Sequence, residues 1–451
     1  MPLRLRVSAN AFVARPIQWS PTPRHYCVGA PFSTQAFSAV RASPRLETFT
    51  VPCRSNGSIT VDVFHAEKSG SHVVIYLPPG PTLPSNPEEE DVLIATLNEH
   101  SEATIARINY RASTIHQYPT PIHDALAGYD WVRDTLLRDA LQRPYLTRLG
   151  VCGELVGGSL GAMLALTECR SGETRVGAAA VNSPLVDWVF PDELPLVDPS
   201  DLPEPLSADE TAFPAHEDLM SSAVQRLASG LARKSRKRSV KAAPLTEWQR
   251  YSNNSVIPTS TLVAKRDALF RRPDDWFDRF ASPIHFFRSP HAQMVLPQSN
   301  DVSASRQPDK MLDIEIQMSI DHYTDVGSQT PVSPELPTLT RCRSYARNYP
   351  LVGTKISLPA WHVSTGAENP LSDQAKEFTK MLRRSVARHT LKFHAGRTRW
   401  HDTTEKQMYE EAAEDRVRFE SHPGLGLWSG SVQRMQEVGS WMKECLDVGA
   451  N

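Results

Sequence analysis

Residues 148–161 read RLGVCGELVGGSLG, and this stretch decides how the rest of the chain is interpreted. It begins in a short apolar strand predicted over Arg148–Cys152 and ends in a helix predicted over Ser159–Cys169. Between them, residues 157–161 read GGSLG and have the form Gly-x-Ser-x-Gly. Where this motif joins a strand to a helix, the serine hydroxyl is exposed on a tight turn and attacks the substrate. We therefore predict that Ser159 is a nucleophile.

The surrounding sequence alternates apolar strand patterns with amphipathic helix patterns. Such alternation predicts an α/β class fold with a mostly parallel sheet that is covered by helices on both faces. The predicted strands are Leu46–Val51, Ile59–Phe64, His72–Leu77, Thr104–Tyr110, Arg148–Cys152, Val176–Val181, Lys355–Val363 and His389–Phe393. The predicted helices are Glu88–Glu99, Pro121–Ala140, Ser159–Cys169, Ser372–Ala387 and Ser431–Leu446.

The alternation stops in a long proline-rich and polar stretch in the middle of the chain. A stretch of this length is too long for an ordinary loop, so we predict a partly irregular cap over residues 191–349, inserted into a core of residues 47–190 and 350–451. Helical pieces are expected at Met220–Arg233 and Pro273–Phe280. A basic cluster follows the first of these pieces. We interpret it as a solvated loop, and the alternative is a nuclear import signal. It comprises Arg233, Lys234, Arg236, Lys237, Arg238 and Lys241.

The N-terminal residues 1–46 contain six arginines, no lysine and no acidic residue. An arginine-rich, serine-containing and acid-free segment is typical of a mitochondrial transit peptide. The prediction is mitochondrial import, with a disordered tail of a cytoplasmic protein as the alternative.

The overall composition excludes several classes of protein. The 49 Lys and Arg residues nearly balance the 51 Asp and Glu residues, which argues against binding nucleic acid through bulk charge. The six cysteines form no Cys-x-x-Cys pair, which argues against a zinc ribbon or a disulfide scaffold. The longest apolar runs, such as His72–Leu77, are far shorter than the ~20 residues of a transmembrane helix. The sequence also lacks a dinucleotide fingerprint and a metal-ligand cluster, so we expect no metal and no organic cofactor.

Two further stretches carry a resemblance to a known family. Residues 109–111 read NYR and residues 118–126 read YPTPIHDAL. Here the chain resembles the α/β-hydrolases of the hormone-sensitive-lipase-like (alpha/beta hydrolase fold-3) esterases, in which a strand ends in Tyr-Arg and a proline-rich approach leads into a helix. The resemblance covers residues 47–190 and 355–447. It implies an α/β-hydrolase fold and a serine esterase whose catalytic residues follow in the order Ser, acid, His.

The resemblance implies a position for the catalytic acid. Residues 366–373 read GAENPLSD and resemble the family segment Gly-x-x-Asp-x-Leu-x-Asp, which places Asn369 where an aspartate normally stands. An asparagine holds a histidine ring without stabilising its charged form, and in a serine protease this change costs about ten-thousand-fold in turnover. Glu368, one residue earlier, is the alternative acid.

The remaining two parts of the expected site are a histidine and an oxyanion hole. In the family order the histidine follows the last strand, which favours His401, in the loop beyond the predicted strand His389–Phe393, over His394 at the end of that strand. Residues 77–81 read LPPGP where the family has His-Gly-Gly-Gly, and prolines donate no amide hydrogen. The two expected oxyanion donors are therefore the amides of Gly80 and Leu160.

These residues predict a serine hydrolase that cleaves a small-molecule carboxylic ester through an acyl-enzyme on Ser159. The alternative is an α/β-hydrolase-fold protein that has lost catalysis and serves as a binding or scaffold protein, which Asn369 and the altered oxyanion loop favour. Acyl transfer to a nucleophile other than water is a third possibility. The substrate and the oligomeric state are not specified by the sequence.

Overall fold

The computed structural model describes residues 45–53, 57–67, 72–84, 86–138, 149–170, 175–195, 197, 201–205, 245–295, 337–351, 354–396 and 400–447. All the elements named below belong to one unit, Pro44–Asn451. The predicted targeting segment (residues 1–46) lies outside the described residues except for its last two. The predicted helix Met220–Arg233 and the basic cluster also lie outside them.

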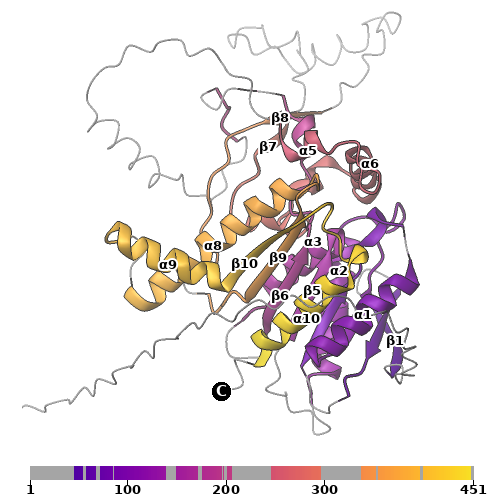
Figure 1. Ribbon diagram of the computed structural model, residues 1–451. Coiled ribbons are helices and arrows are strands. Elements are labelled where there is room, and N and C mark those ends of the chain that lie inside the picture. Colours follow the sequence, from indigo (N-terminus) through magenta and orange to yellow (C-terminus); the bar gives the residue numbers. More distant parts are fainter. Residues whose placement is uncertain are drawn as a thin grey trace, which may run out of the picture. The chain divides into compact units, whose positions relative to one another are not determined.

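An eight-stranded sheet forms the centre of the unit, in the order β1-β2-β4-β3-β5-β6-β9-β10 (Figure 1). The pairs β1/β2 and β2/β4 are antiparallel, and the other five pairs are parallel. The strands are β1 Leu46–Pro52, β2 Ser58–Phe64, β3 Val73–Leu77, β4 Thr104–Asn109, β5 Leu149–Glu154, β6 Val176–Asn182, β9 Ala360–Gly366 and β10 Val417–His422. The predicted mostly parallel sheet is confirmed.

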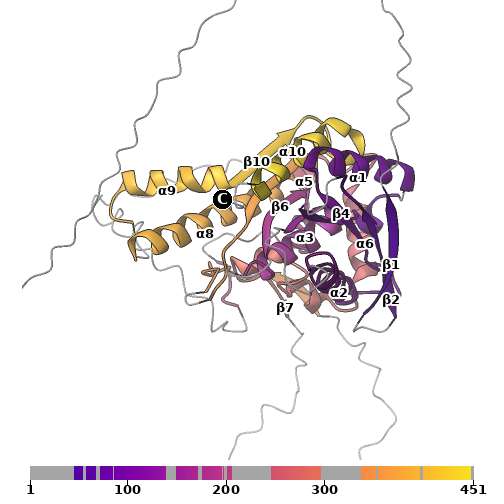
Figure 2. The same cartoon turned by 90° about the horizontal axis from the view of Figure 1, so that it is seen from below.

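Helices cover both faces of this sheet. Figure 2 shows α1 and α10 side by side on one face, with α2 and α3 on the other. Helix α8 lies on the α3 face, because Trp361 of β9 contacts Phe378 of α8 while the next residue, His362, faces Trp441 of α10. The helices are α1 Pro87–Ser101, α2 Thr120–Thr135, α3 Leu155–Thr167, α8 Ser372–Ala395, α9 Thr403–Arg416 and α10 Val432–Asp447.

The buried strands have continuous apolar sequences, as a sheet covered on both faces requires. All five residues of β3 are buried, and helix α3 is buried from Leu155 to Leu166. Among the described residues, no helix is both long and apolar enough to cross a membrane.

Residues 183–359, here called the connecting segment, run from β6 to β9. Their described parts contain short helices and a two-stranded sheet near α3 (Figure 1). These elements are α5 Glu247–Arg250, α6 Thr259–Leu269, the 3-10 turns η2 Pro191–Glu193, η3 Pro273–Phe277 and η4 Pro283–Phe286, and strands β7 Ala292–Val295 and β8 Thr338–Arg341. The predicted domain boundaries stay predictions.

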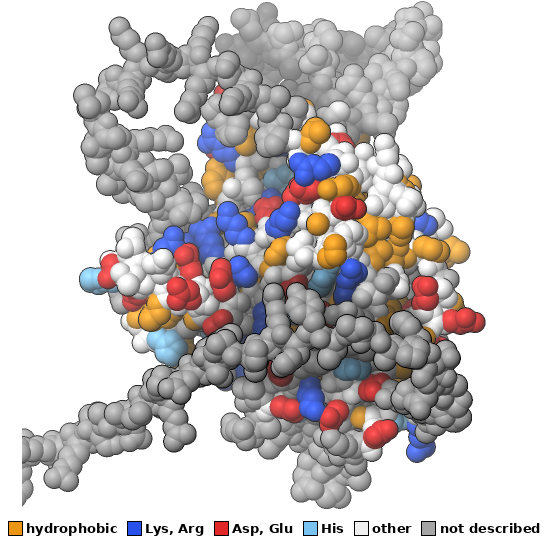
Figure 3. All heavy atoms as spheres, viewed as in Figure 1, with side chains coloured by type: hydrophobic (Ala, Val, Ile, Leu, Met, Phe, Trp, Pro, Cys, Tyr) orange, Lys and Arg blue, Asp and Glu red, His pale blue; other side chains and the backbone are white. Residues whose placement is uncertain are grey.

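The C-terminal third differs from the sequence prediction. The stretch His389–Phe393 is not a strand but the end of the 24-residue helix α8. The last strand of the sheet is β10, and α9 precedes it. Arg383 of α8 pairs with Glu414 of α9 at 3.0 Å, and charges of both signs mix over these helices in Figure 3. The misplacement of the last strand matters because the catalytic histidine was inferred from it.

Candidate functional site

The turn from β5 into α3 has the geometry of a nucleophile elbow, and its central residue is Leu155. Helix α3 begins at this residue, directly after the strand ends at Glu154. Leu155 has a φ of 52°, in the left-handed region that a residue with a Cβ atom rarely adopts. In an α/β hydrolase the nucleophile occupies this sharp, strained strand-to-helix turn.

Two glycines identify the same turn by close packing. A Cβ atom on Gly157 would lie 2.1 Å from the carbonyl oxygen of Pro78, and one on Gly153 would lie 2.4 Å from the carbonyl oxygen of Gly157. Neither position accepts a side chain, because backbone atoms occupy the space. The elbow motif therefore reads Gly153-Glu154-Leu155-Val156-Gly157, with leucine at the nucleophile position.

Ser159 lies elsewhere than predicted. It is the fifth residue of α3, one helical turn beyond the elbow, and it is fully buried. Its hydroxyl donates a hydrogen bond of 3.2 Å to the carbonyl oxygen of Ala281 in the connecting segment. The prediction that Ser159 stands exposed on the strand-to-helix turn was wrong, because the helix starts four residues earlier than its sequence pattern indicated.

The two predicted oxyanion donors are separated in the structure. Gly80, in the 3-10 turn η1 (Gly80–Thr82) after β3, has a φ of 74° and lies beside the elbow, since a Cβ on it would be 3.2 Å from the Cβ of Val156. Leu160 lies inside α3, where helical hydrogen bonding uses its amide. Val156 follows the elbow residue and lies in the first turn of α3, where amides have no partner within the helix. The pair that matches an oxyanion hole is therefore Gly80 with Val156.

Asn369 occupies the predicted acid position, after the carboxyl end of β9, but it is fully used in structural hydrogen bonds. Its side-chain nitrogen donates to the hydroxyl of Ser183 at 2.9 Å and to the carbonyl oxygen of Leu425 at 3.0 Å. Its side-chain oxygen accepts from the amide of Leu371 at 2.9 Å. The alternative acid, Glu368, is exposed, and its amide donates to the carbonyl oxygen of Gly424.

Neither predicted histidine reaches this site. His401 is exposed and precedes α9. Helix α9 leads into β10, which begins beside Trp361 near the amino end of β9, whereas Asn369 follows the carboxyl end of β9. His394 is exposed in the last turn of α8. The loop that follows β10, residues 423–427, reads PGLGL and offers Leu425 next to Asn369. His422 ends β10 and faces Glu420 instead.

Sequence reasoning missed a buried carboxyl group at the elbow. Glu154 is 2% exposed and accepts hydrogen bonds from the side chain of Asn182 at 2.7 Å and from the amide of Trp428 at 2.8 Å. Burial raises its pKa to about 7, although these two donors oppose the shift. Glu154 is the last residue of β5 and lies between Gly153 and Gly157, and this glycine spacing is the sequence signal that could have drawn attention to it.

The space beside Ser159 is filled by an aromatic cluster of Tyr118, Trp188 and Phe270. The rings of Tyr118 and Phe270 stack at 4.4 Å, and Trp188 meets Phe270 edge-on at 5.1 Å. The indole nitrogen of Trp188 donates to the carbonyl oxygen of Ala281, the same acceptor that Ser159 uses. The connecting segment thus packs directly on the start of α3.

Comparison with known proteins agrees with this fold. Residues 74–282 match a family model described as alpha/beta hydrolase fold. A thermostable carboxylesterase cloned from a metagenomic library is 15% identical, with a TM-score of 0.50 and coverage of 91% of this chain and 92% of that chain. Carboxyl esterase 2 from Tuber melanosporum is 11% identical, with a TM-score of 0.50 and coverage of 92% and 90%. A hyperthermophilic esterase from the archaeon Pyrobaculum calidifontis is 16% identical, with a TM-score of 0.48 and coverage of 89% and 83%. The comparison with curated proteins found no match.

Proposed function

We propose that this chain, whose residues 74–282 match the alpha/beta hydrolase fold model, keeps that fold as a binding protein without the acyl-enzyme chemistry. The observation that carries this proposal is Leu155 at the elbow. Acyl transfer in this fold begins with attack by an oxygen or sulfur nucleophile held on that turn, and a leucine side chain has neither.

The other catalytic positions support the same conclusion. Asn369 replaces the acid, and all three of its hydrogen bonds go to structural groups. The loop after β10, residues 423–427, contains no histidine, and the Leu425 carbonyl oxygen accepts a hydrogen bond from Asn369. Without a histidine in this described loop, a hydroxyl on the elbow lacks the group that usually takes its proton.

The predicted nucleophile, Ser159, has an unsuitable environment for this chemistry. Its hydroxyl is buried, and a backbone carbonyl accepts its hydrogen. The neighbouring Trp188 shares that acceptor, so Ser159 anchors the connecting segment on α3. Gly80 and Val156 stay side by side at the elbow, since a Cβ on Gly80 would lie 3.2 Å from the Cβ of Val156, although Leu155, between β5 and Val156, offers no nucleophile.

The test is labelling of the full-length protein by an alkyl fluorophosphonate, with wild type and Ser159→Ala compared. An active serine esterase in the same reaction is the positive control, and circular dichroism verifies that both proteins are folded. We expect no labelling of the folded wild type. Labelling that disappears in Ser159→Ala would overturn the proposal and restore Ser159 as an ester-hydrolysing nucleophile.

Leu155→Ser is the matched variant. It restores a hydroxyl at the elbow while the acid and the histidine stay absent, so we expect at most slow labelling. Strong labelling of Leu155→Ser, together with an unlabelled wild type, would identify Leu155 as the single residue that blocks the chemistry.

A further inference from the structure

Residues 281–291 of the connecting segment, here called the cover, lie against the start of α3. The hydroxyl of Ser159 and the indole nitrogen of Trp188 both donate hydrogen bonds to the carbonyl oxygen of Ala281, the first residue of the cover. Helix α3 is buried from Leu155 to Leu166. A ligand therefore reaches Ser159 only when the cover moves away from it.

The far end of the cover is fixed by Arg288, whose guanidinium contacts three side chains. Its Nη2 donates to the carboxylate of Asp187 at 2.8 Å, and its Nη1 lies 3.1 Å from Nδ1 of His291. Its Nε lies 3.4 Å from the carboxylate of Glu377 in α8. Arg288 and Asp187 are buried, whereas 44% of the Glu377 side chain is exposed. Arg288 thus stands between one buried and one exposed carboxylate.

The contact between Arg288 and His291 requires a neutral histidine. A guanidinium only donates hydrogen bonds, so Nδ1 of His291 is the acceptor and Nε2 carries the hydrogen of the neutral ring. The same Nδ1 lies 3.4 Å from the carboxylate of Asp187. Protonation places a hydrogen on Nδ1, which removes the bond from Arg288 and sets two cations against each other. The protonated ring then competes with Arg288 for Asp187, and Glu377 is left as the other partner of Arg288.

A second histidine of the cover is also held neutral. His285 is fully buried, and neither of its ring nitrogens has a partner among the described residues. Burial lowers its pKa to about 4, and Arg288 and His291 act in the same direction, against Asp187. Burial, Arg288 and Arg341 likewise hold the pKa of His291 below its ordinary value, although Asp187 opposes them. Both rings bind a proton more readily when the cover is displaced into water.

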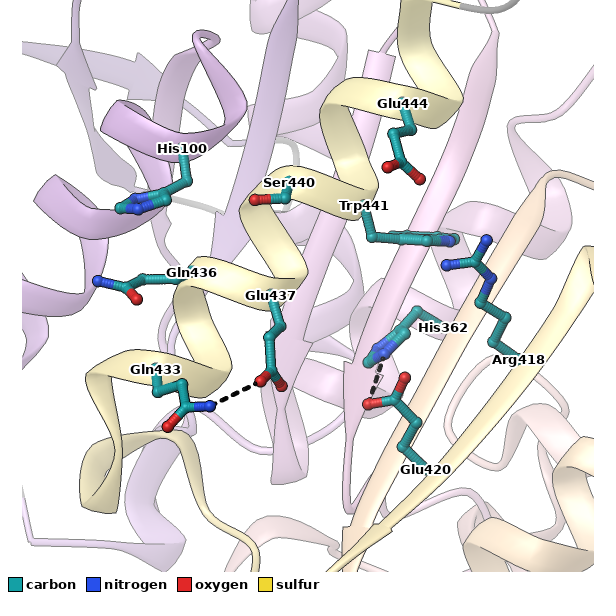
Figure 4. A pocket seen from close by; sticks show the side chains of 10 residues that line it. All are labelled: His100, His362, Arg418, Glu420, Gln433, Gln436, Glu437, Ser440, Trp441 and Glu444. Atoms are coloured by element: carbon teal, nitrogen blue, oxygen red, sulfur yellow. Dashed lines mark hydrogen bonds and ion pairs between the residues drawn. The ribbon is translucent and has the colours of Figure 1, made fainter. Parts of the chain in front are cut away.

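The other buried histidine of the described chain has the opposite surroundings. His362 borders a pocket beside α10, and its Nε2 lies 3.2 Å from the carboxylate of Glu420 (Figure 4). A proton added to His362 strengthens its contact with an anion, whereas a proton added to His291 opposes its contact with a cation. Of these two histidines, the one that acid sets against its partner is the one that attaches the cover.

We propose that protonation of His291 and His285 shifts the cover away from the start of α3, so that acid opens this face of the fold to a ligand. At neutral pH both rings are uncharged and the cover is closed. The closed form binds fewer protons than the open form, so the opening constant rises as the pH falls below 6.5. The inference concerns access to Ser159 and holds whether or not the elbow is inert.

The test is hydrogen exchange of the full-length protein at pH 8 and pH 5, followed by mass spectrometry, with each rate divided by the intrinsic exchange rate at that pH. With a pKa of about 4 in the closed form and 6.5 in the open form, His285 alone raises the opening constant about thirtyfold between these pH values. We therefore expect the protection of residues 281–291 to fall at least tenfold at pH 5. Strand β3, in the sheet, should keep its protection.

The double variant His285→Phe/His291→Gln should lose this response to pH. Glutamine keeps an oxygen acceptor for Arg288 without titrating, and phenylalanine replaces a ring whose nitrogens bond nothing in the described chain. His389→Gln is the matched control, because His389 also has a lowered pKa through burial and two neighbouring cations but lies on α8, outside the cover. It should respond like the wild type.

If the double variant does not fold, His291→Gln alone decides, and its protection should fall less than that of the wild type. Equal protection of the wild-type cover at both pH values would overturn the proposal. So would an equal loss of protection in β3, because the opening would then be global unfolding. A full response to pH in the folded double variant, or in His291→Gln, would equally exclude these histidines as its cause.

Discussion

Leu155 keeps a left-handed backbone conformation that costs free energy, although its side chain has no group that could act as a nucleophile. A left-handed conformation costs a residue with a Cβ atom roughly 1–2 kcal/mol, and Leu155 adopts it with a φ of 52°. The close packing of Gly157 under Pro78 fixes the path of the chain on both sides of the turn. The strained turn is therefore enforced by the surrounding backbone, and it persists independently of the side chain at its centre.

Asn369 also has a structural role at a position where the family has a catalytic acid. Replacing it with aspartate, which is the residue normal for a catalytic acid, removes both donated hydrogen bonds and sets a carboxylate oxygen 3.0 Å from the Leu425 carbonyl oxygen. We expect Asn369→Asp to lower the free energy of unfolding by about 2–3 kcal/mol at pH 7, measured by urea denaturation. Asn254→Asp is the control, because Asn254 uses only its oxygen, which accepts from the amides of Val256 and Ile257. A stable Asn369→Asp with gained esterase activity would show that a catalytic acid was missing.

Glu154 predicts a dependence of stability on pH. Burial raises its pKa from 4.5 to about 7, so the folded state holds a proton that the unfolded state releases. The stabilisation is complete below pH 4.5 and is lost as the pH rises towards 7, and it amounts to about 3 kcal/mol at most. Glu154→Gln keeps an oxygen acceptor for Asn182 and Trp428 but does not titrate. Urea denaturation at pH 5 and pH 8 should show wild type losing more stability than Glu154→Gln, and equal losses would contradict the shifted pKa.

At the scale of elements, the sequence predicted the N-terminal half well because its strands are short, apolar and bounded by prolines or glycines. Strands β1, β2, β3, β4 and β6 were predicted within one or two residues of their observed bounds. The start of α3 was missed because glycines at 153, 157 and 158 resemble a loop in sequence, whereas here they allow close packing. The alternating pattern of His389–Phe393 resembled a strand because only the whole length of α8 reveals its helical period.

These two errors, the missed start of α3 and the false strand His389–Phe393, determined how much of the site could be predicted. The motif Gly-x-Ser-x-Gly located the correct strand-helix junction but the wrong residue. The pairs Gly153/Gly157 and Gly157/Gly161 have the same spacing, and only the second pair encloses a serine. Gly80 lies beside Val156 and Asn369 follows β9, and the roles predicted for them stay predictions, whereas His401 was inferred from a strand, His389–Phe393, that is part of α8. Tertiary contacts alone distinguish these cases, because backbone approach distances are not encoded in local composition.

The two glycine pairs give a direct test of which motif frames the elbow. Gly157→Ala would place its Cβ 2.1 Å from the Pro78 oxygen, and backbone cannot yield cheaply, so we expect a loss of about 3 kcal/mol or more. Gly161→Ala meets its nearest atom, a side-chain carbon of Val151, at 3.3 Å and gains helix propensity, so its effect should be close to zero. Thermal denaturation of both variants measures the difference. A larger loss in Gly161→Ala would favour the motif centred on Ser159.

At the scale of the whole unit, a buried ion pair holds the later part of the connecting segment to the residues that directly follow β6. Asp187 follows β6, and its carboxylate accepts from the Arg288 guanidinium at 2.8 Å. Burial raises the pKa of Asp187, but the facing His291, Arg288 and His285 outweigh this effect and hold the pKa below its usual value. The side chain of Gln374 in α8 accepts a hydrogen bond from the amide of Asp187 and donates one to its carbonyl oxygen. Asp187 therefore joins the residues after β6 to the later part of the connecting segment through its carboxylate, and to α8 through its backbone.

Removing this carboxylate should destabilise the attachment strongly, because it leaves the Arg288 charge buried without its main partner. We expect Asp187→Ala to lower the free energy of unfolding by about 3–5 kcal/mol in urea denaturation. Glu414→Ala breaks the more exposed pair with Arg383 and should cost no more than about 1 kcal/mol. Limited proteolysis distinguishes the two ways in which stability can be lost. Early cleavage of Asp187→Ala within residues 245–295, before the sheet is cut, indicates that the connecting segment detaches as a unit. Simultaneous cleavage throughout would instead mean that the segment and the sheet unfold together, and that the connecting segment is a cooperative part of the core.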